Sequence, residues 1–152
     1  MKNRYKVYLD TSVVSALFDK RNPERMNLTR NFFDNSHLFE IIISELTVAE
    51  IEATPDSILR NKMRAQINSF KIVDLPSGVN KLTDEIIRHG AVPLNFNEDA
   101  FHISIAILSK ADFLACWNFK HIVRRKTRDI IRMITTLNDL KNIEIITPAE
   151  LL

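Results

Sequence analysis

An α/β fold with a mostly parallel central sheet is predicted by two features of the sequence. Short apolar runs alternate with helical patterns along the whole chain, which is typical of βαβ units. The 152 residues are 45% hydrophobic and contain no internal repeat and no linker, so we expect a single domain over residues 1–152. A domain of this size needs no metal or disulfide to stabilise its fold.

The first half of the chain contains two predicted strands and four predicted helices. Lys6–Leu9 is expected to be a strand because its side chains alternate in polarity, and a helix should start at about Val13 with Ser12 as its N-cap. Pro23 is a favourable first residue for a helix over 23–35. The remaining expected elements are a strand over 38–43 and helices over 45–53 and 56–69.

The second half continues the alternation. A strand over 71–75 precedes a helix over 79–89 that Gly90 ends, and the helix over 98–110 is apolar on most sides and should be buried. A short strand is expected over 113–116, a last strand over 142–146 and a last helical turn over 148–152. Between them a helix over 127–140 should bury one face, made of Ile130, Met133, Ile134, Leu137 and Leu140.

Composition excludes several classes of protein. Two glycines cannot make a Gly-rich phosphate loop, and the single cysteine, Cys116, excludes an internal disulfide or a zinc site with two thiolates. No apolar run has the length of a signal peptide core or of a membrane helix, so we expect a soluble cytoplasmic protein without membrane contact. The net charge of +2 is too small to indicate nucleic-acid binding by itself.

Four polar residues are expected at the carboxyl edge of the sheet, where ligands bind in this fold class. Asp10 and Asn118 each follow a predicted strand, Glu50 lies on the helix after the second strand, and Asp99 begins the buried helix. Each also has a structural interpretation, as a turn or cap residue, a snorkelling surface carboxylate or a first-turn acid. His102, one turn after Asp99, is interpreted as a satisfied core histidine.

Three converging carboxylates repel one another and raise each other's pKa values unless a counter-charge is present. Mg²⁺ supplies that charge, accepts oxygen ligands and bridges carboxylates to phosphate. Such an ion promotes hydrolysis of phosphodiester bonds. The pattern therefore favours a metal-dependent phosphodiesterase.

Four segments together resemble the PIN-domain nucleases, in particular the VapC-like toxins of toxin–antitoxin pairs. The segments are Val7-Tyr-Leu-Asp10-Thr11-Ser12, Ser44-Glu-Leu-Thr-Val-Ala-Glu50, Glu98-Asp99-Ala-Phe-His102 and Trp117-Asn118-Phe-Lys120-His121. The resemblance implies a three-layer α/β/α fold, an endoribonuclease dependent on Mg²⁺ or Mn²⁺, a homodimer and a small antitoxin partner. By position it implies that Asp10, Glu50 and Asp99 are catalytic metal ligands.

The fourth catalytic position is a departure from that family, since Asn118 stands where many relatives have an aspartate. An amide oxygen can still bind a metal, but the lost charge would weaken a second ion. Thr11 and Ser12 are expected to orient a water at the metal. Asp112 is interpreted as structural, because it precedes its strand.

Substrate contacts are predicted after the fourth motif. Lys120, His121, Arg124, Arg125 and Arg128 are expected to contact RNA phosphates, although a solvated helix face is an equal alternative. Trp117 and Phe119 are candidates for stacking on unpaired bases, and Trp117 is equally a core candidate.

The sequence disfavours two other functions and leaves a third open. A phosphoaspartate receiver would need a further aspartate after the third strand, where Leu75 is followed by Pro76 and Ser77. A haloacid-dehalogenase-like phosphatase needs Asp-x-Asp, and Asp10-Thr11-Ser12 lacks the second acid. A catalytically weak or inactive PIN-fold module that binds RNA or a partner protein is the alternative that stays open. The segment 17–33 is a candidate partner groove or simple core packing.

Overall fold

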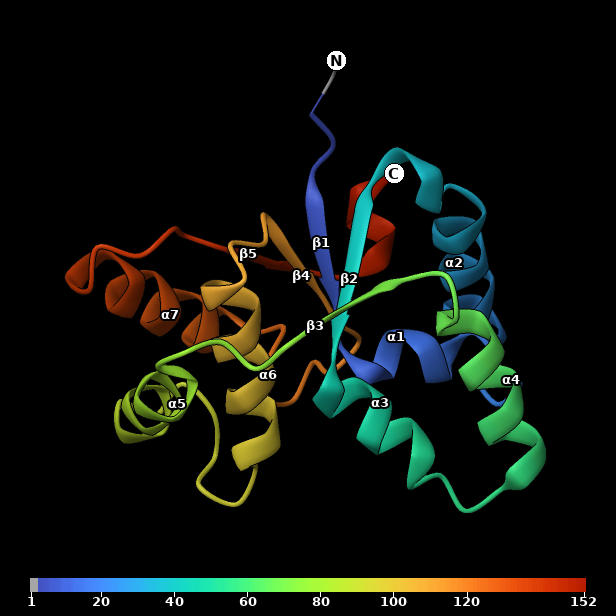
Figure 1. Ribbon diagram of the computed structural model, residues 1–152, viewed down its shortest axis with the longest axis horizontal. Coiled ribbons are helices and arrows are strands. Elements are labelled where there is room, and N and C mark those ends of the chain that lie inside the picture. Colours follow the sequence, from blue (N-terminus) through green and yellow to red (C-terminus); the bar gives the residue numbers. More distant parts are fainter. Residues whose placement is uncertain (1–2) are drawn as a thin grey trace.

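A five-stranded parallel sheet forms the centre of the computed structural model, which describes residues 3–152 (Figure 1). The strands are β1 (Lys6–Leu9), β2 (Glu40–Ser44), β3 (Lys71–Val73), β4 (Phe113–Ala115) and β5 (Glu144–Ile146). Their order across the sheet is β3-β2-β1-β4-β5, and every neighbouring pair is parallel. The predicted parallel α/β fold is confirmed.

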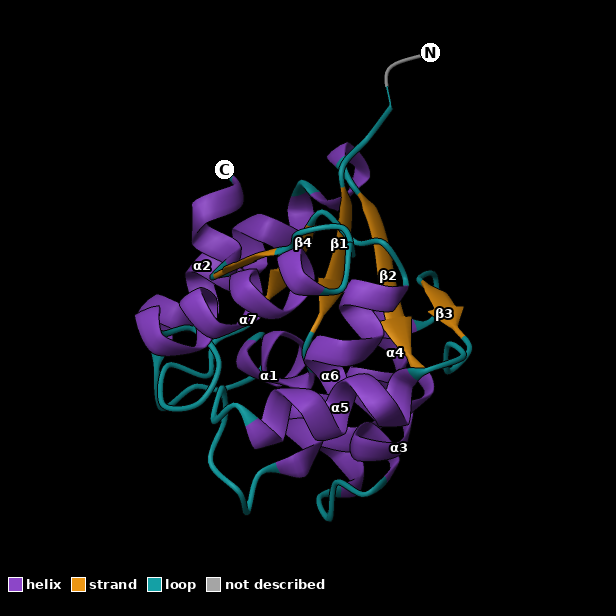
Figure 2. Cartoon of the chain, turned by 90° about the vertical axis from the view of Figure 1, so that its left-hand side faces the viewer, coloured by secondary structure: helices purple, strands orange, loops and turns teal. Residues whose placement is uncertain are grey.

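Helices cover both faces of the sheet, which makes three layers (Figures 1 and 2). One side carries α1 (Thr11–Ala16), α2 (Pro23–Asp34), α3 (Glu45–Glu52) and α4 (Ser57–Ile67), and the other carries α5 (Val79–Arg88), α6 (Asn97–Leu108) and α7 (Arg125–Leu137). Two short 3-10 helices, η1 (Ser36–Leu38) and η2 (Pro148–Leu151), complete the elements. Among residues 3–152 no helix is long and apolar enough to cross a membrane.

The central strand β1 contributes side chains to two hydrophobic cores, one on each face of the sheet. Val7 and Leu9 pack into the cluster beneath α1, α2 and α4, whereas Tyr8 packs into the cluster beneath α5, α6 and α7. This follows from the strand period of two, which sends successive side chains to opposite faces. All three side chains are fully buried.

Three predicted local features differ in the structure. The first helix begins at Thr11 rather than Val13, and its N-cap is Asp10 rather than Ser12. Leu38 belongs to η1, so the second strand starts later, at Glu40. The buried face of α7 consists of Thr127, Ile131, Ile134 and Thr135, while Met133 and Leu137 are exposed.

Strands β2 and β3 lie on one side of β1, and the chain then returns to add β4 and β5 on the other side. The strand order therefore reverses between β1 and β4. Ligands in open α/β sheets bind outside the carboxyl ends of the strands at such a switch point. The backbone N–H of Asp10 donates to the Ala115 carbonyl at 3.1 Å, so the chain after β1 stays beside the end of β4. The topology therefore places a candidate site at Asp10.

Candidate functional site

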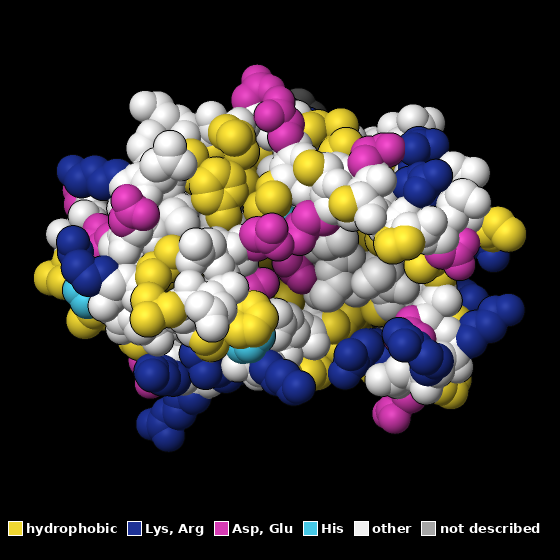
Figure 3. All heavy atoms as spheres, turned by 90° about the horizontal axis from the view of Figure 1, so that it is seen from below, with side chains coloured by type: hydrophobic (Ala, Val, Ile, Leu, Met, Phe, Trp, Pro, Cys, Tyr) yellow, Lys and Arg dark blue, Asp and Glu magenta, His cyan; other side chains and the backbone are white. Residues whose placement is uncertain are grey.

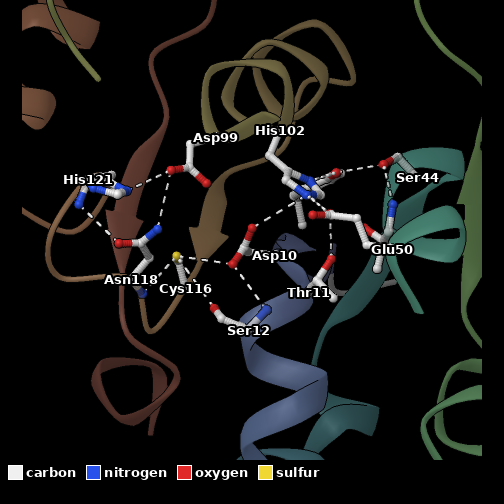
Figure 4. Close-up of polar contacts among 12 residues, drawn as sticks. Asp10, Thr11, Ser12, Ser44, Glu50, Asp99, His102, Cys116, Asn118 and His121 are labelled. Atoms are coloured by element: carbon white, nitrogen blue, oxygen red, sulfur yellow. Dashed lines mark hydrogen bonds and ion pairs between the residues drawn. The ribbon is translucent and has the colours of Figure 1, made fainter. Parts of the chain in front are cut away.

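The four predicted polar positions come together at this switch point (Figure 4). Asp10 directly follows β1, Glu50 lies on α3, Asp99 lies in the first turn of α6, and Asn118 lies in the loop after β4. Seen from below in Figure 3, acidic side chains gather near the centre of this face and Lys and Arg side chains lie toward its margin.

Asp10 is buried and holds its position through one carboxylate oxygen. Its Oδ2 accepts the Ser12 backbone N–H at 3.1 Å and the Cys116 thiol at 3.4 Å. The other oxygen, Oδ1, accepts no hydrogen bond from residues 3–152. Asp10 therefore caps a helix, as the structural interpretation has it, and its Oδ1 has only a longer contact of 3.6 Å to His102 Nε2.

Glu50 is held in the same way by neighbours from two other elements. Its Oε1 accepts hydrogen bonds from the Thr11 hydroxyl at 2.8 Å and from His102 Nε2. Its Oε2 has no donor among the described residues. The side chain is 28% exposed, so it faces the site rather than open solvent as a snorkelling carboxylate would.

His102 is a site residue that sequence reasoning missed. It is buried, as a core histidine would be, but its Nε2 lies between Glu50 and Asp10, 3.6 Å from Asp10 Oδ1. Its Nδ1 is 2.6 Å from the Tyr8 hydroxyl, which also bonds the Ser44 hydroxyl at 2.7 Å. The only sequence signal was its position three residues after Asp99, on the same side of α6.

The carboxylates on either side of His102 shift its pKa. Burial by itself would lower the pKa of His102, but the charge of Asp10 and the hydrogen bond to Glu50 raise it above its ordinary value. Protonation of this imidazole would offset part of the repulsion between the two carboxylates. The sequence analysis considered only a metal ion as the counter-charge, and protonated His102 is a second source of positive charge at the same place.

Asp99 is held by Asn118 and His121. Its Oδ2 is 3.0 Å from His121 Nδ1 and 3.4 Å from Asn118 Nδ2, and its Oδ1 has no donor among residues 3–152. Burial and the charge of Asp10 raise the pKa of Asp99, against the opposing effect of His121. The imidazole of His121 also packs on Phe96, with ring centroids 3.8 Å apart.

The orientation of the Asn118 amide follows from its two partners. The carboxylate of Asp99 can only accept, so it requires the amide nitrogen, whereas the His121 backbone N–H can only donate and takes the amide oxygen at 3.0 Å. The Asn118 amide oxygen, which was considered as a metal ligand, therefore already accepts a hydrogen bond. The Asn118 amide N–H donates to Asp99 and positions it, whereas an aspartate at residue 118 would repel the Asp99 carboxylate.

One or two of these carboxylates, together with water, suit a divalent cation. Asp10 Oδ1, Glu50 Oε2 and Asp99 Oδ1 are carboxylate oxygens without protein donors, while the partner oxygen of each carboxylate is fixed. Within residues 3–152 no three such side chains are arranged closely enough to surround one metal ion. Mg²⁺ commonly binds through one or two carboxylates and otherwise water, so the residues suit one hydrated ion.

The predicted accessory residues have partners of their own. The Thr11 hydroxyl is used by Glu50, and the Ser12 hydroxyl accepts the Trp117 backbone N–H at 3.0 Å. The guanidinium of Arg124 bonds Thr127 and the Ala91 carbonyl, and Arg128 bonds the Ile145 carbonyl at 2.9 Å. Lys120 is exposed, and Arg125 is 93% exposed with a weak contact to Asp129 at 3.7 Å. Their roles toward water and RNA stay predictions.

Asp112 has the structural role expected of it. Its Oδ2 accepts the Lys6 backbone N–H at 2.8 Å, and its Oδ1 bonds Lys141 at 2.7 Å. These contacts tie the start of β4 to β1 and lie at the opposite edge of the sheet from the acidic cluster.

Comparison with known proteins agrees with this architecture. The PIN domain family profile matches residues 7–116. No curated protein matches the chain. Among solved structures, a chain of VapBC2 from Rickettsia felis, crystallised with a DNA fragment from their promoter, matches with a TM-score of 0.56 and 16% identity. The match covers 92% of this chain and 96% of that one, and at this identity it shows a shared fold.

Proposed function

Since this chain belongs to the PIN-domain family, we propose that it is an endoribonuclease that hydrolyses RNA phosphodiester bonds with Mg²⁺ or Mn²⁺. PIN domains are in general nucleases that use divalent metal ions. The observation that carries the proposal is the set of uncommitted carboxylate oxygens on Asp10, Glu50 and Asp99 at the switch point of the sheet.

Protein hydrogen bonds give these acids fixed positions. The α1 N-terminus holds Asp10, Thr11 and His102 hold Glu50, and the Asn118 and His121 side chains hold Asp99. When bound, a divalent ion supplies positive charge at the scissile phosphate and lowers the pKa of water. Because these side chains are already in position before the reaction, the site needs less rearrangement to reach the transition state.

RNA would be positioned by cations beside the cluster. Lys120 and Arg125 are exposed and available for phosphate contacts, whereas Arg124 and Arg128 would contribute only at the cost of their backbone hydrogen bonds. Phosphate contacts fix the register of a strand but carry no sequence information.

We assign the biological role to a toxin–antitoxin pair. The shared fold with a chain of the VapBC2 complex supports a small antitoxin partner, and a homodimer in the cytoplasm is part of the same proposal. A single PIN-like domain over residues 1–152 suits this role, because the VapBC2 match covers nearly the whole of both chains.

Cleavage of single-stranded and structured RNA in the presence of Mg²⁺ or Mn²⁺ tests the activity. Asp10→Asn and Asp99→Asn should each abolish cleavage while circular dichroism and melting temperature stay close to those of the wild type. Normal cleavage by both variants would overturn the site assignment.

A module that binds RNA or protein without cutting it is the second candidate. It is favoured by one observation: His102 Nε2 contacts Glu50 and His121 Nδ1 contacts Asp99, so two of the carboxylates already have histidine partners without a metal. Titration with Mn²⁺ separates the two functions, because a non-cutting module should show no metal-dependent rise in melting temperature.

A further inference from the structure

The loop after β4 carries an exposed aromatic ring beside the acidic cluster. Phe119 directly follows Asn118, and 49% of its surface is exposed although phenylalanine is usually buried. The preceding residue, Trp117, is only 8% exposed. The two rings are neighbours, with centroids 6.2 Å apart at 57°.

Trp117 gives this aromatic pair a rigid base. Its indole N–H donates to the Thr29 hydroxyl on α2 at 2.9 Å, and its backbone N–H donates to the Ser12 hydroxyl at 3.0 Å. The backbone N–H of Ser12 in turn donates to Asp10 Oδ2 at 3.1 Å. The position of the aromatic pair is therefore fixed relative to the candidate catalytic acids.

Arg25 of α2 lies over both rings. Its guanidinium carbon is 5.2 Å from the centroid of Trp117 and 5.5 Å from that of Phe119, which are cation–π distances. Among residues 3–152 no side-chain or backbone oxygen accepts a hydrogen bond from this guanidinium. By contrast, Arg64 and Arg128 donate to protein oxygens. Arg25 thus presents a planar set of donors, suited to phosphate, beside the remaining exposed surface of Phe119.

We propose that Arg25, Trp117 and Phe119 form a subsite that binds an unpaired RNA nucleotide, with the base stacked on Phe119 and a phosphate on Arg25. The inference rests on the proposed function and narrows its substrate to single-stranded or looped RNA. Bases in an A-form duplex are already stacked on one another and are reached poorly by side chains, so only a splayed base can use this ring. Stacking on an aromatic ring is tolerant of sequence, because every base has a π-face.

Trp117 is the only tryptophan of the chain, so its fluorescence reports on this subsite directly. Protein in EDTA, which prevents metal-dependent cleavage, is titrated with a short single-stranded RNA and separately with the same RNA as a duplex. The single strand should quench or shift Trp117 emission. Phe119→Ala should weaken its binding by about 5- to 160-fold, the range expected for one lost stacking contact.

Matched variants separate stacking from general effects. Phe119→Tyr keeps an aromatic face and should retain wild-type affinity, and Arg25→Ala should lose affinity. Leu137→Ala, at an exposed apolar residue on the opposite layer, and Arg88→Ala, at an exposed arginine of α5, should bind as the wild type does. Melting temperatures confirm that each variant is folded.

Each outcome decides the proposal. Unchanged single-strand affinity in Phe119→Ala, or equal affinity for the duplex, would overturn it, even if the wild type cleaves RNA with Mn²⁺ and the proposed function stands. A Phe119→Ala variant that keeps RNA affinity but loses binding to a co-purified partner protein would assign the patch to that protein instead. A wild type that neither binds nor cleaves RNA would overturn both proposals.

Discussion

Replacing Asn118 by aspartate should turn a stabilising contact into a repulsive one. The amide nitrogen of Asn118 lies 3.4 Å from Asp99 Oδ2, so the Asn118→Asp variant would place a carboxylate oxygen at that point. Two unit charges at this distance repel by about 1 kcal/mol in bulk water and by about 5 kcal/mol at an effective dielectric constant of 20. Asp99 is only 18% exposed, so the cost should lie above the lower limit.

The same change should strengthen the response to metal. A divalent ion between the two carboxylates would remove the repulsion, so Mn²⁺ should raise the melting temperature of Asn118→Asp more than that of the wild type. In EDTA the variant should melt lower, by about 2 to 4 °C for each kcal/mol lost. Differential scanning fluorimetry with and without Mn²⁺ measures both effects.

The chain offers a matched control on its surface. Asn138 also donates its amide to a carboxylate, Glu85 Oε1 at 3.0 Å, but both side chains are far from the acidic cluster and in solvent. Asn138→Asp should therefore show no Mn²⁺-dependent gain. An Asn118→Asp variant with the stability and the Mn²⁺ response of the wild type would refute the assigned orientation of the amide and the coupling of Asn118 to Asp99.

Three other substitutions test the packing and electrostatics around the site. Thr47→Val should raise the free energy of unfolding by about 1 kcal/mol in urea denaturation, because Thr47 Oγ1 is buried without a partner among the described residues. Thr29→Val should lower it by about 1 to 3 kcal/mol, because the buried Trp117 indole N–H loses its acceptor. Partial burial opposes ionisation of Asp112, but hydrogen bonds from Lys141 and the backbone lower its pKa. The stabilisation from Asp112 is therefore present above the ordinary carboxyl pKa and lost as the pH falls through the lowered one. Unfolding at several pH values should show Asp112→Asn less stable at pH 7 and equal to the wild type in strong acid.

Most of the fold is predictable from sequence because its signals are local. The strands at Lys6–Leu9 and 71–75, the prolines and glycines that bound helices, and the apolar helix over 98–110 all have periodic patterns that the structure confirms to within a few residues. Alternation of strand and helix then leaves a parallel sheet as the consistent arrangement. Convergence of Asp10, Glu50, Asp99 and Asn118 at one edge follows from that topology.

The missed features depend on contacts between distant segments. Asp10 caps α1 through the Ser12 backbone N–H, whereas the Ser12 hydroxyl accepts the backbone N–H of Trp117, which is 105 residues away in the sequence. His102 gains its role from Tyr8 and Glu50, which lie far away in the sequence. No periodic pattern contains this information.

The buried face of α7 was predicted only in part, for a different reason. Ile134 is buried, and Ile130 and Leu140 pack against the core, but Met133 and Leu137 are exposed. Leu137 fits the expected apolar stripe, but the helix turns Thr127, Ile131, Ile134 and Thr135 toward the sheet. Threonine hydroxyls there are satisfied within the fold: Thr127 donates to the Ala91 carbonyl at 2.6 Å. In a sequence pattern a threonine counts as polar, so a buried threonine whose hydroxyl bonds to a backbone carbonyl is easily assigned to the surface.

Crystals soaked in Mn²⁺ test the central claim most directly, because the anomalous signal locates the ion without any assumption about activity. We predict one Mn²⁺ at the end of β1, in contact with the uncommitted oxygens of Asp10 and Asp99 and close to Glu50, and no such peak in crystals of Asp10→Asn. Wild-type crystals at millimolar Mn²⁺ without a peak at this position, or with Mn²⁺ bound only elsewhere, would contradict the account.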